Sequence, residues 1–85
     1  MRRAAKVDAN HEAIVAALRA QGWKVCSLAA LGGGVPDLLA HHEYRGWRLI
    51  EVKAGKGKLT ALQENFWLKG WPVTIVRSVD DATSL

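Results

Sequence analysis

The chain has 85 residues and a formal net charge of +4; 49% of its residues are hydrophobic and 24% are charged. This composition excludes an intrinsically disordered protein, and the length predicts one small domain over residues 1–85. The single cysteine, Cys26, excludes an intramolecular disulfide and a cysteine-based zinc site. The excess of lysine and arginine favours a polyanionic partner but does not by itself establish one.

The basic N-terminus is not followed by the apolar segment that a secretory signal peptide contains. No uninterrupted apolar run approaches the roughly 20 residues that a membrane-spanning helix needs. We therefore expect a cytosolic protein.

Residues 8–22 predict the first helix. Asp8 is a candidate N-cap, and Gly22 suits the residue that follows the last helical turn. Between them, Ile14 and Leu18 lie on one face at helical spacing. This apolar face predicts that the helix packs against a sheet.

Three strands are expected next, over residues 23–31, 37–41 and 47–53. Three consecutive glycines at residues 32–34 precede the second strand. They can form a tight turn or, alternatively, cradle a phosphate, although they lack the lysine and hydroxyl of a P-loop. Residues 43–46 form the turn that joins the second and third strands.

The second helix is expected over residues 60–69, because Thr60 and Gln63 have the spacing of a capping box. A short apolar strand over residues 73–76 follows, and Ser78 can start a final helical turn. The predicted order is helix, three strands, helix, strand. It indicates an α/β (α+β) domain with a central mixed four-stranded sheet flanked by helices and one parallel crossover.

Charged residues stand at the ends of the predicted hairpin. Asp37 opens its first strand, and Glu51 and Lys53 close its second, where the period of two places them on one face. The antiparallel register brings these three groups to the same end of the hairpin. Two neighbouring carboxylates need a proton or a cation between them, and oxygen ligands suit Mg²⁺ or Mn²⁺. A nearby lysine can orient water or offset charge on a phosphate.

These motifs resemble the PD-(D/E)xK nuclease superfamily, and within it the stand-alone VRR-NUC domains of viral and phage type. The resemblance extends from about residue 8 to residue 76. The matching pieces are Asn10 with Glu12, residues 32–37 with Pro36-Asp37, Glu51-Val52-Lys53, and Leu59-Thr60 with Gln63.

The resemblance implies a restriction-endonuclease-like αβββαβ core and metal-dependent hydrolysis of DNA phosphodiester bonds. It implies Mg²⁺ or Mn²⁺ held by Asp37, Glu51 and the Val52 carbonyl, with Lys53 positioning the attacking water. Branched DNA such as a Holliday junction is an implied substrate, and a homodimer in a bacterium or phage-infected cell is an implied assembly. The alternative is a non-catalytic DNA-binding or protein-interaction module of the same fold.

Two further side chains have competing interpretations. The resemblance implies that Glu12 is a metal ligand, directly or through water, but the helix dipole alone favours glutamate in a first turn. It also implies that Gln63 completes the catalytic site, whereas a capping box requires only that Gln63 bond back to Thr60. Asn10 is expected to start the helix and not to bind metal.

Basic residues lie near both ends of the proposed site. If the metal site exists, we expect phosphate contacts from them; otherwise they are solubilising charges. The candidate DNA-binding residues are Arg2, Arg3, Lys6, Lys56 and Lys58.

The aromatic residues and histidines have simpler expectations. His41 and His42 are adjacent in a strand, so they point to opposite faces and are expected to have no metal role. Trp47 and Trp67 are expected in the core. Trp71, between a glycine and a proline, is expected to be exposed and is a candidate for a subunit interface.

Overall fold

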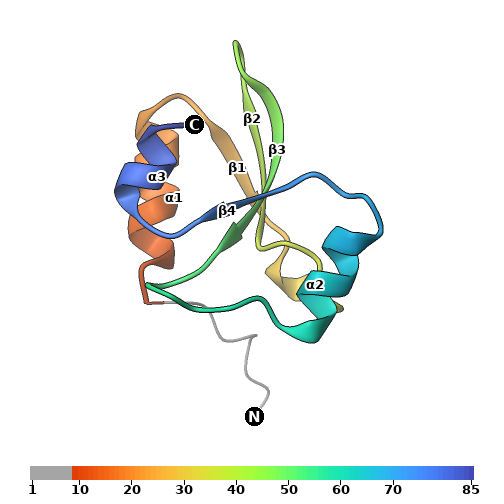
Figure 1. The fold of residues 1–85 in the computed structure, drawn as a ribbon. Helices are drawn as coiled ribbons and strands as arrows, with labels where there is room; N and C mark the ends of the chain where they lie inside the picture. The colour runs from red at the N-terminus through yellow and green to blue at the C-terminus, as the bar shows by residue number, and fades with distance from the viewer. Residues whose placement is uncertain (1–8) are drawn as a thin grey trace.

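The computed structural model describes residues 9–85. Figure 1 shows a sheet with two helices on one side and a third on the other. Among residues 9–85 no helix is long and apolar enough to cross a membrane. The elements in chain order are α1 (His11–Ala20), β1 (Lys24–Ser27), the 3₁₀ helix η1 (Ala29–Leu31), β2 (Leu38–His42), β3 (Gly46–Val52), α2 (Ala61–Leu68), β4 (Val73–Val76) and α3 (Val79–Thr83).

The sheet has the strand order β1-β2-β3-β4. The first two pairings are antiparallel, and Leu38 of β2 lies opposite Ile50 of β3. The last pairing is parallel, with Leu49 of β3 beside Val73 of β4, so α2 lies in the crossover between them. The predicted αβββαβ order and the mixed four-stranded sheet are therefore confirmed.

The hydrophobic core lies between one face of this sheet and the helices α1 and α3, which pack side by side (Figure 1). Ile14 and Leu18 of α1 are fully buried, as their four-residue spacing predicts, and they meet Ile50 and Val52 of β3. Burying each such side chain contributes about 1.5–3 kcal/mol. The sheet face that carries Ile50 and Val52 is covered by the core. The opposite face, which carries Glu51, is therefore the one available for a site.

The first strand is shorter than predicted, because Ala29–Leu31 form η1 and not the second half of a strand. The Leu28 N–H still donates to the Asp37 carbonyl (2.7 Å), which is the last link between the two segments. Beyond it Pro36 offers no N–H, so the pairing ends. The α1 helix begins after Asn10; the candidate cap Asp8 lies outside the described residues.

Two of the tryptophans are not in the core, contrary to expectation. Trp47 is 66% exposed and Trp67 is 52% exposed. Trp47 belongs to β3 and Trp67 to α2, the short helix that, within residues 9–85, lies alone on its side of the sheet (Figure 1). Trp23 is buried, and Trp71 is exposed as predicted.

The histidines lie on opposite faces, as predicted. The ring of His41 packs against Trp47, with centroids 4.6 Å apart. His42 Nε2 lies 3.0 Å from the Gln21 carbonyl, and its Nδ1 accepts the Tyr44 N–H (3.1 Å). An accepting Nδ1 requires that Nε2 carry the proton and donate to Gln21. His42 therefore closes the hairpin turn onto the end of α1, which is a structural role.

Candidate active site

Asp37 directly precedes β2, and its side chain makes a hydrogen bond to β3 in place of the backbone. One pair beyond Leu38 and Ile50, it lies opposite Glu51. The Asp37 carboxylate itself accepts the next β3 hydrogen bond, from the Val52 N–H (2.9 Å). This bond holds the carboxylate at the end of β3.

Glu51 is a buried carboxylate with only 3% of its surface exposed. Its Oε2 accepts a hydrogen bond from Gln63 Nε2 (3.0 Å) and lies 3.8 Å from Lys53 Nζ. Lys53 is itself 9% exposed. Taking charge out of water is costly, so these partners are what allow Glu51 to stay buried. Folding thus brings Asp37, Glu51 and Lys53 to one end of the sheet, as the hairpin register predicts.

Gln63 completes the capping box and also contacts Glu51, while the catalytic role that the resemblance implies stays a prediction. Its Oε1 accepts the Thr60 N–H (2.8 Å) and its backbone N–H donates to Thr60 Oγ1 (3.2 Å), which completes the capping box of α2. The other end of the same amide donates to Glu51. Because the oxygen is used by the cap, the NH₂ group must face the carboxylate. The start of α2 is therefore linked directly to the site.

The glycine triplet forms the tight turn that precedes Asp37. Gly32, Gly33 and Gly34 all have positive φ (63°, 66° and 86°). At Gly34 a Cβ would overlap the Leu62 carbonyl of α2, so the two backbones pass in direct contact. This contact sets Asp37 beside the first turn of α2, and the turn interpretation is confirmed.

The donor atoms at this place fit a small divalent cation. In a strand, the N–H and C=O of one residue point to the same side, so the Val52 carbonyl faces the side where Asp37 binds the Val52 N–H. Two carboxylates and a carbonyl suit Mg²⁺ or Mn²⁺, which complete their shell with water and phosphate oxygens. Within residues 9–85 no group of three or more His, Cys, Asp or Glu side chains could hold a metal ion. A cation held here would have two carboxylates and one backbone carbonyl as its protein ligands.

Among residues 9–85, Glu12 forms no group of three metal-ligating side chains with Asp37 and Glu51, and its role as a ligand stays a prediction. It is exposed in the first turn of α1. It lines a pocket between α1 and the sheet, together with Arg19, Val25 and Leu38, the residue after Asp37. Its position is the one that the helix dipole favours, at the positive end of α1.

A small, mainly apolar pocket adjoins Glu51 on the α2 side of the sheet. Its polar members are Glu51 and Gln63, and the remaining walls are hydrocarbon or backbone. Low-dielectric walls strengthen the attraction between Glu51 and its partners. The lining residues are Gly34, Pro36, Glu51, Leu59, Gln63, Trp67, Val73 and Ile75.

Asn10 supports the site in a way that was not identified from the sequence. The Asn10 side chain donates to the Arg77 carbonyl (2.7 Å) and to the Lys53 carbonyl (3.4 Å), and its cap position carries no capping hydrogen bond. Asn10 thus ties the start of α1 to the ends of β3 and β4, where Lys53 leaves the sheet. Its expected place at the helix start is confirmed, but its hydrogen bonds require the tertiary fold.

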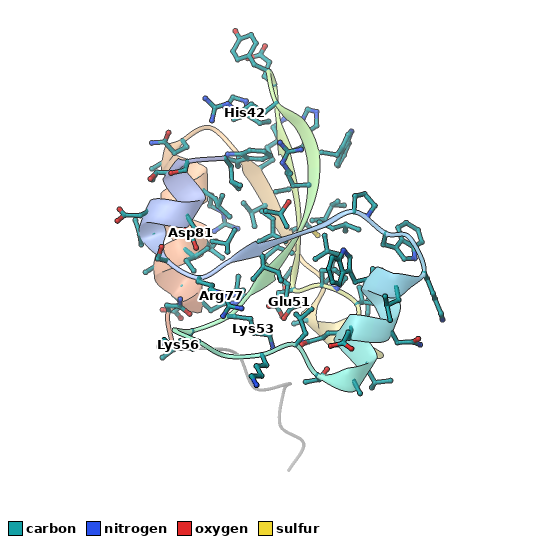
Figure 2. All side chains as sticks on the ribbon, viewed as in Figure 1. His42, Glu51, Lys53, Lys56, Arg77 and Asp81 are labelled. Carbon is teal, nitrogen blue, oxygen red and sulfur yellow. The ribbon has the colours of Figure 1, made fainter. Side chains whose placement is uncertain are left out.

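The candidate DNA-contacting lysines of the loop, Lys56 and Lys58, are exposed. Figure 2 shows Lys56 at the same end of the sheet as Glu51, Lys53 and Arg77. The other candidates, Arg2, Arg3 and Lys6, lie outside the described residues.

Comparison of the chain with protein-family models, with curated proteins and with solved structures finds no match. Function is therefore inferred from the chemistry of the site and from the motifs that compose it.

Proposed function

We propose that this protein is a Mg²⁺- or Mn²⁺-dependent endonuclease that hydrolyses DNA phosphodiester bonds, similar to the VRR-NUC domains of the PD-(D/E)xK superfamily. The observation that carries the proposal is the convergence of Asp37, Glu51 and Lys53 at the end of β3. A second support is Gln63, which joins the same carboxylate from α2.

Each side chain has a distinct role in the proposed reaction. Asp37, Glu51 and the Val52 carbonyl would hold the cation, which when bound acts as a Lewis acid on the phosphate and lowers the pKa of water. The Lys53 ammonium orients the attacking water and offsets negative charge on the scissile phosphate. Gln63 keeps the Glu51 carboxylate in one orientation.

The burial of Glu51 favours an enzyme over the alternative of a non-catalytic DNA-binding module. A carboxylate repels a polyanion, and a buried carboxylate also costs stability. A module that only bound DNA would bind it more tightly without Asp37 and Glu51. A nuclease needs both, because they provide the ligands for its cation.

We further propose that the protein acts in the cytoplasm as a homodimer and that branched DNA is its substrate. Support for the dimer comes from the exposed apolar side chains on and just after α2, among them Leu62, Leu68 and Trp71. In the described chain α2 buries none of its own residues. Exposed apolar surface of this kind marks an interaction site.

The proposal is tested by cleavage of a labelled four-way junction, a flap and a plain duplex in Mg²⁺ and in Mn²⁺. We expect the wild type to cut at least one of them. Lys53→Ala should bind the same DNA and cut it about 100-fold to 1,000-fold more slowly, the usual effect of removing one group that stabilises transition-state charge.

The matched control is Lys24→Ala. Lys24 is an exposed lysine at the opposite end of the β1–β2 pairing from Asp37, so this variant loses the same charge and should cut at the wild-type rate. If the wild type binds DNA but cuts none of the three substrates in either metal, the non-catalytic module becomes the better account.

A further inference from the structure

A glycine-rich turn follows Lys53 directly. The Gly57 N–H donates to the Ala54 carbonyl (2.9 Å), and Gly55 has a φ of 51°, which suits glycine. The turn leaves the Lys56 side chain exposed at its tip, and exposed Lys58 follows it. A turn with this composition pays a high entropic cost for order unless something holds it.

Arg77, the residue after β4, holds this turn. Its Nη1 donates to the Gly55 carbonyl (3.0 Å) and to the Gly57 carbonyl (2.6 Å), the two peptide oxygens on either side of Lys56. Hydrogen bonds from a charged donor are shorter and stronger than those between neutral groups. The guanidinium therefore fixes the backbone from which Lys56 projects.

Arg77 is in turn anchored on both helices of the core. Its N–H donates to Asp81 Oδ2 of α3 (2.8 Å), and its carbonyl accepts the side-chain N–H of Asn10 (2.7 Å). Figure 2 shows Arg77 between Asp81 and the loop, on the side of Lys53. The turn is thus connected through one residue to the rigid part of the domain.

We propose that Arg77 is a positioning residue that holds residues 54–58 as a phosphate-binding rim beside Lys53. The ligands of this rim are backbone phosphates of the DNA next to the one that is cut, and Lys56 and Lys58 contact them. This inference rests on the proposed nuclease function. Its physical basis is that ordering a loop before binding removes that entropic cost from the binding step. Since Nη1 of Arg77 is bonded to loop carbonyls, Arg77 acts through the lysines.

A double-mutant cycle tests this dependence. Binding of fluorescently labelled duplex DNA is measured without divalent metal for the wild type, Arg77→Met, Lys56→Ala/Lys58→Ala, and the combination. We expect Arg77→Met to weaken binding about fivefold to tenfold in the wild type and less than about twofold when both lysines are absent. Arg77→Met should also make the affinity less dependent on salt, because fewer phosphates are neutralised.

The matched control is Arg19→Met. Arg19 on α1 also donates to one backbone carbonyl, that of Val25 (3.3 Å), so the variant loses the same charge and a similar bond away from the loop. Its affinity should stay close to that of the wild type. Arg77→Lys, which keeps a charged donor, should restore part of the affinity. Gly55→Ala, strained at positive φ, should reproduce the loss by disturbing the turn directly if Arg77→Met fails to fold.

Three results overturn the inference: equal losses from Arg77→Met with and without the lysines, a loss of the same size in Arg19→Met, or a wild type that does not bind DNA. With either of the first two, cleavage by the wild type still supports the proposed function. The remaining case is that DNA affinity shows the expected coupling between Arg77 and the two lysines, but the wild type cuts no substrate. That result overturns the proposed nuclease function and still supports the phosphate-binding rim.

Discussion

At the scale of single residues, the site depends on side chains that satisfy two demands at once. Asp37 replaces a missing ladder partner for Val52 and supplies a carboxylate. Gln63 caps α2 with one end of its amide and holds Glu51 with the other. In both cases the hydrogen bond to the backbone restricts the side-chain rotamer. The Asp37 carboxylate and the Gln63 amide nitrogen are therefore held in position without additional residues.

The double role of Asp37 allows its charge to be separated from its hydrogen bond. Asp37→Asn keeps an oxygen that can accept the Val52 N–H, so we expect a folded protein, but it loses a charged ligand. In thermal melts, saturating Mn²⁺ should raise the melting temperature of the wild type, since a ligand at 100 times its Kd contributes about 2.7 kcal/mol. The variant should show little of this shift.

The control for this prediction is Asp80→Asn, which removes an exposed carboxylate from α3. It should respond to Mn²⁺ as the wild type does. An equal Mn²⁺-induced shift in Asp37→Asn would contradict a metal site at the carboxylate pair.

At the scale of elements, the site is assembled where secondary-structure elements end. The β3 strand ends at Val52, β4 ends just before Arg77, α1 begins after Asn10 and α2 begins after Thr60. Ends of elements carry backbone groups without regular partners, and here side chains satisfy them. The position of α2 is set by the glycine turn that passes against its first residues.

The contact between Gly34 and α2 predicts unequal effects within the glycine triplet. Gly34→Ala should lower the free energy of unfolding by more than about 2 kcal/mol, because the new methyl would add a backbone overlap to the cost of positive φ. Gly33→Ala faces open space at a similar φ, so it should lose only about 1–2 kcal/mol. Urea unfolding measures both values. Equal losses would show that α2 does not require this close approach.

At the scale of the whole molecule, the two faces of the sheet have different partners. The face toward α1 and α3 contains the core, whereas the other face carries Glu51 and, beside α2, a set of exposed apolar side chains. A domain this small buries a limited fraction of its surface, and association is a common supplement to its stability. We expect that association to involve exposed apolar side chains of α2 such as Leu62 and Leu68.

The homodimer can be tested by sedimentation of the wild type and of Leu62→Glu/Leu68→Glu. The wild type should sediment as a dimer and the variant as a monomer, because buried unpaired carboxylates oppose an apolar interface. Tyr44→Glu is the control, since Tyr44 is highly exposed at the hairpin turn, away from α2. A monomeric wild type, or dissociation by Tyr44→Glu alone, would contradict this interface.

The amino-acid sequence by itself determined the order of the elements and the pairing of Asp37 with Glu51. Apolar spacing, glycines and a capping box are local signals, and an antiparallel hairpin brings residues at equal distances from its turn together. The carboxylate pair could therefore be predicted without any knowledge of the other elements.

The packing of the elements against one another fixed which surfaces were covered and which distant groups met. It left Trp47 of β3 exposed, because the short α2 covers only part of its face of the sheet, and it left Trp67 exposed on α2 itself. It joined Arg77 to the carbonyls of Gly55 and Gly57. Those contacts link residues far apart in the chain through backbone atoms, which every residue has, so no sequence pattern marks them.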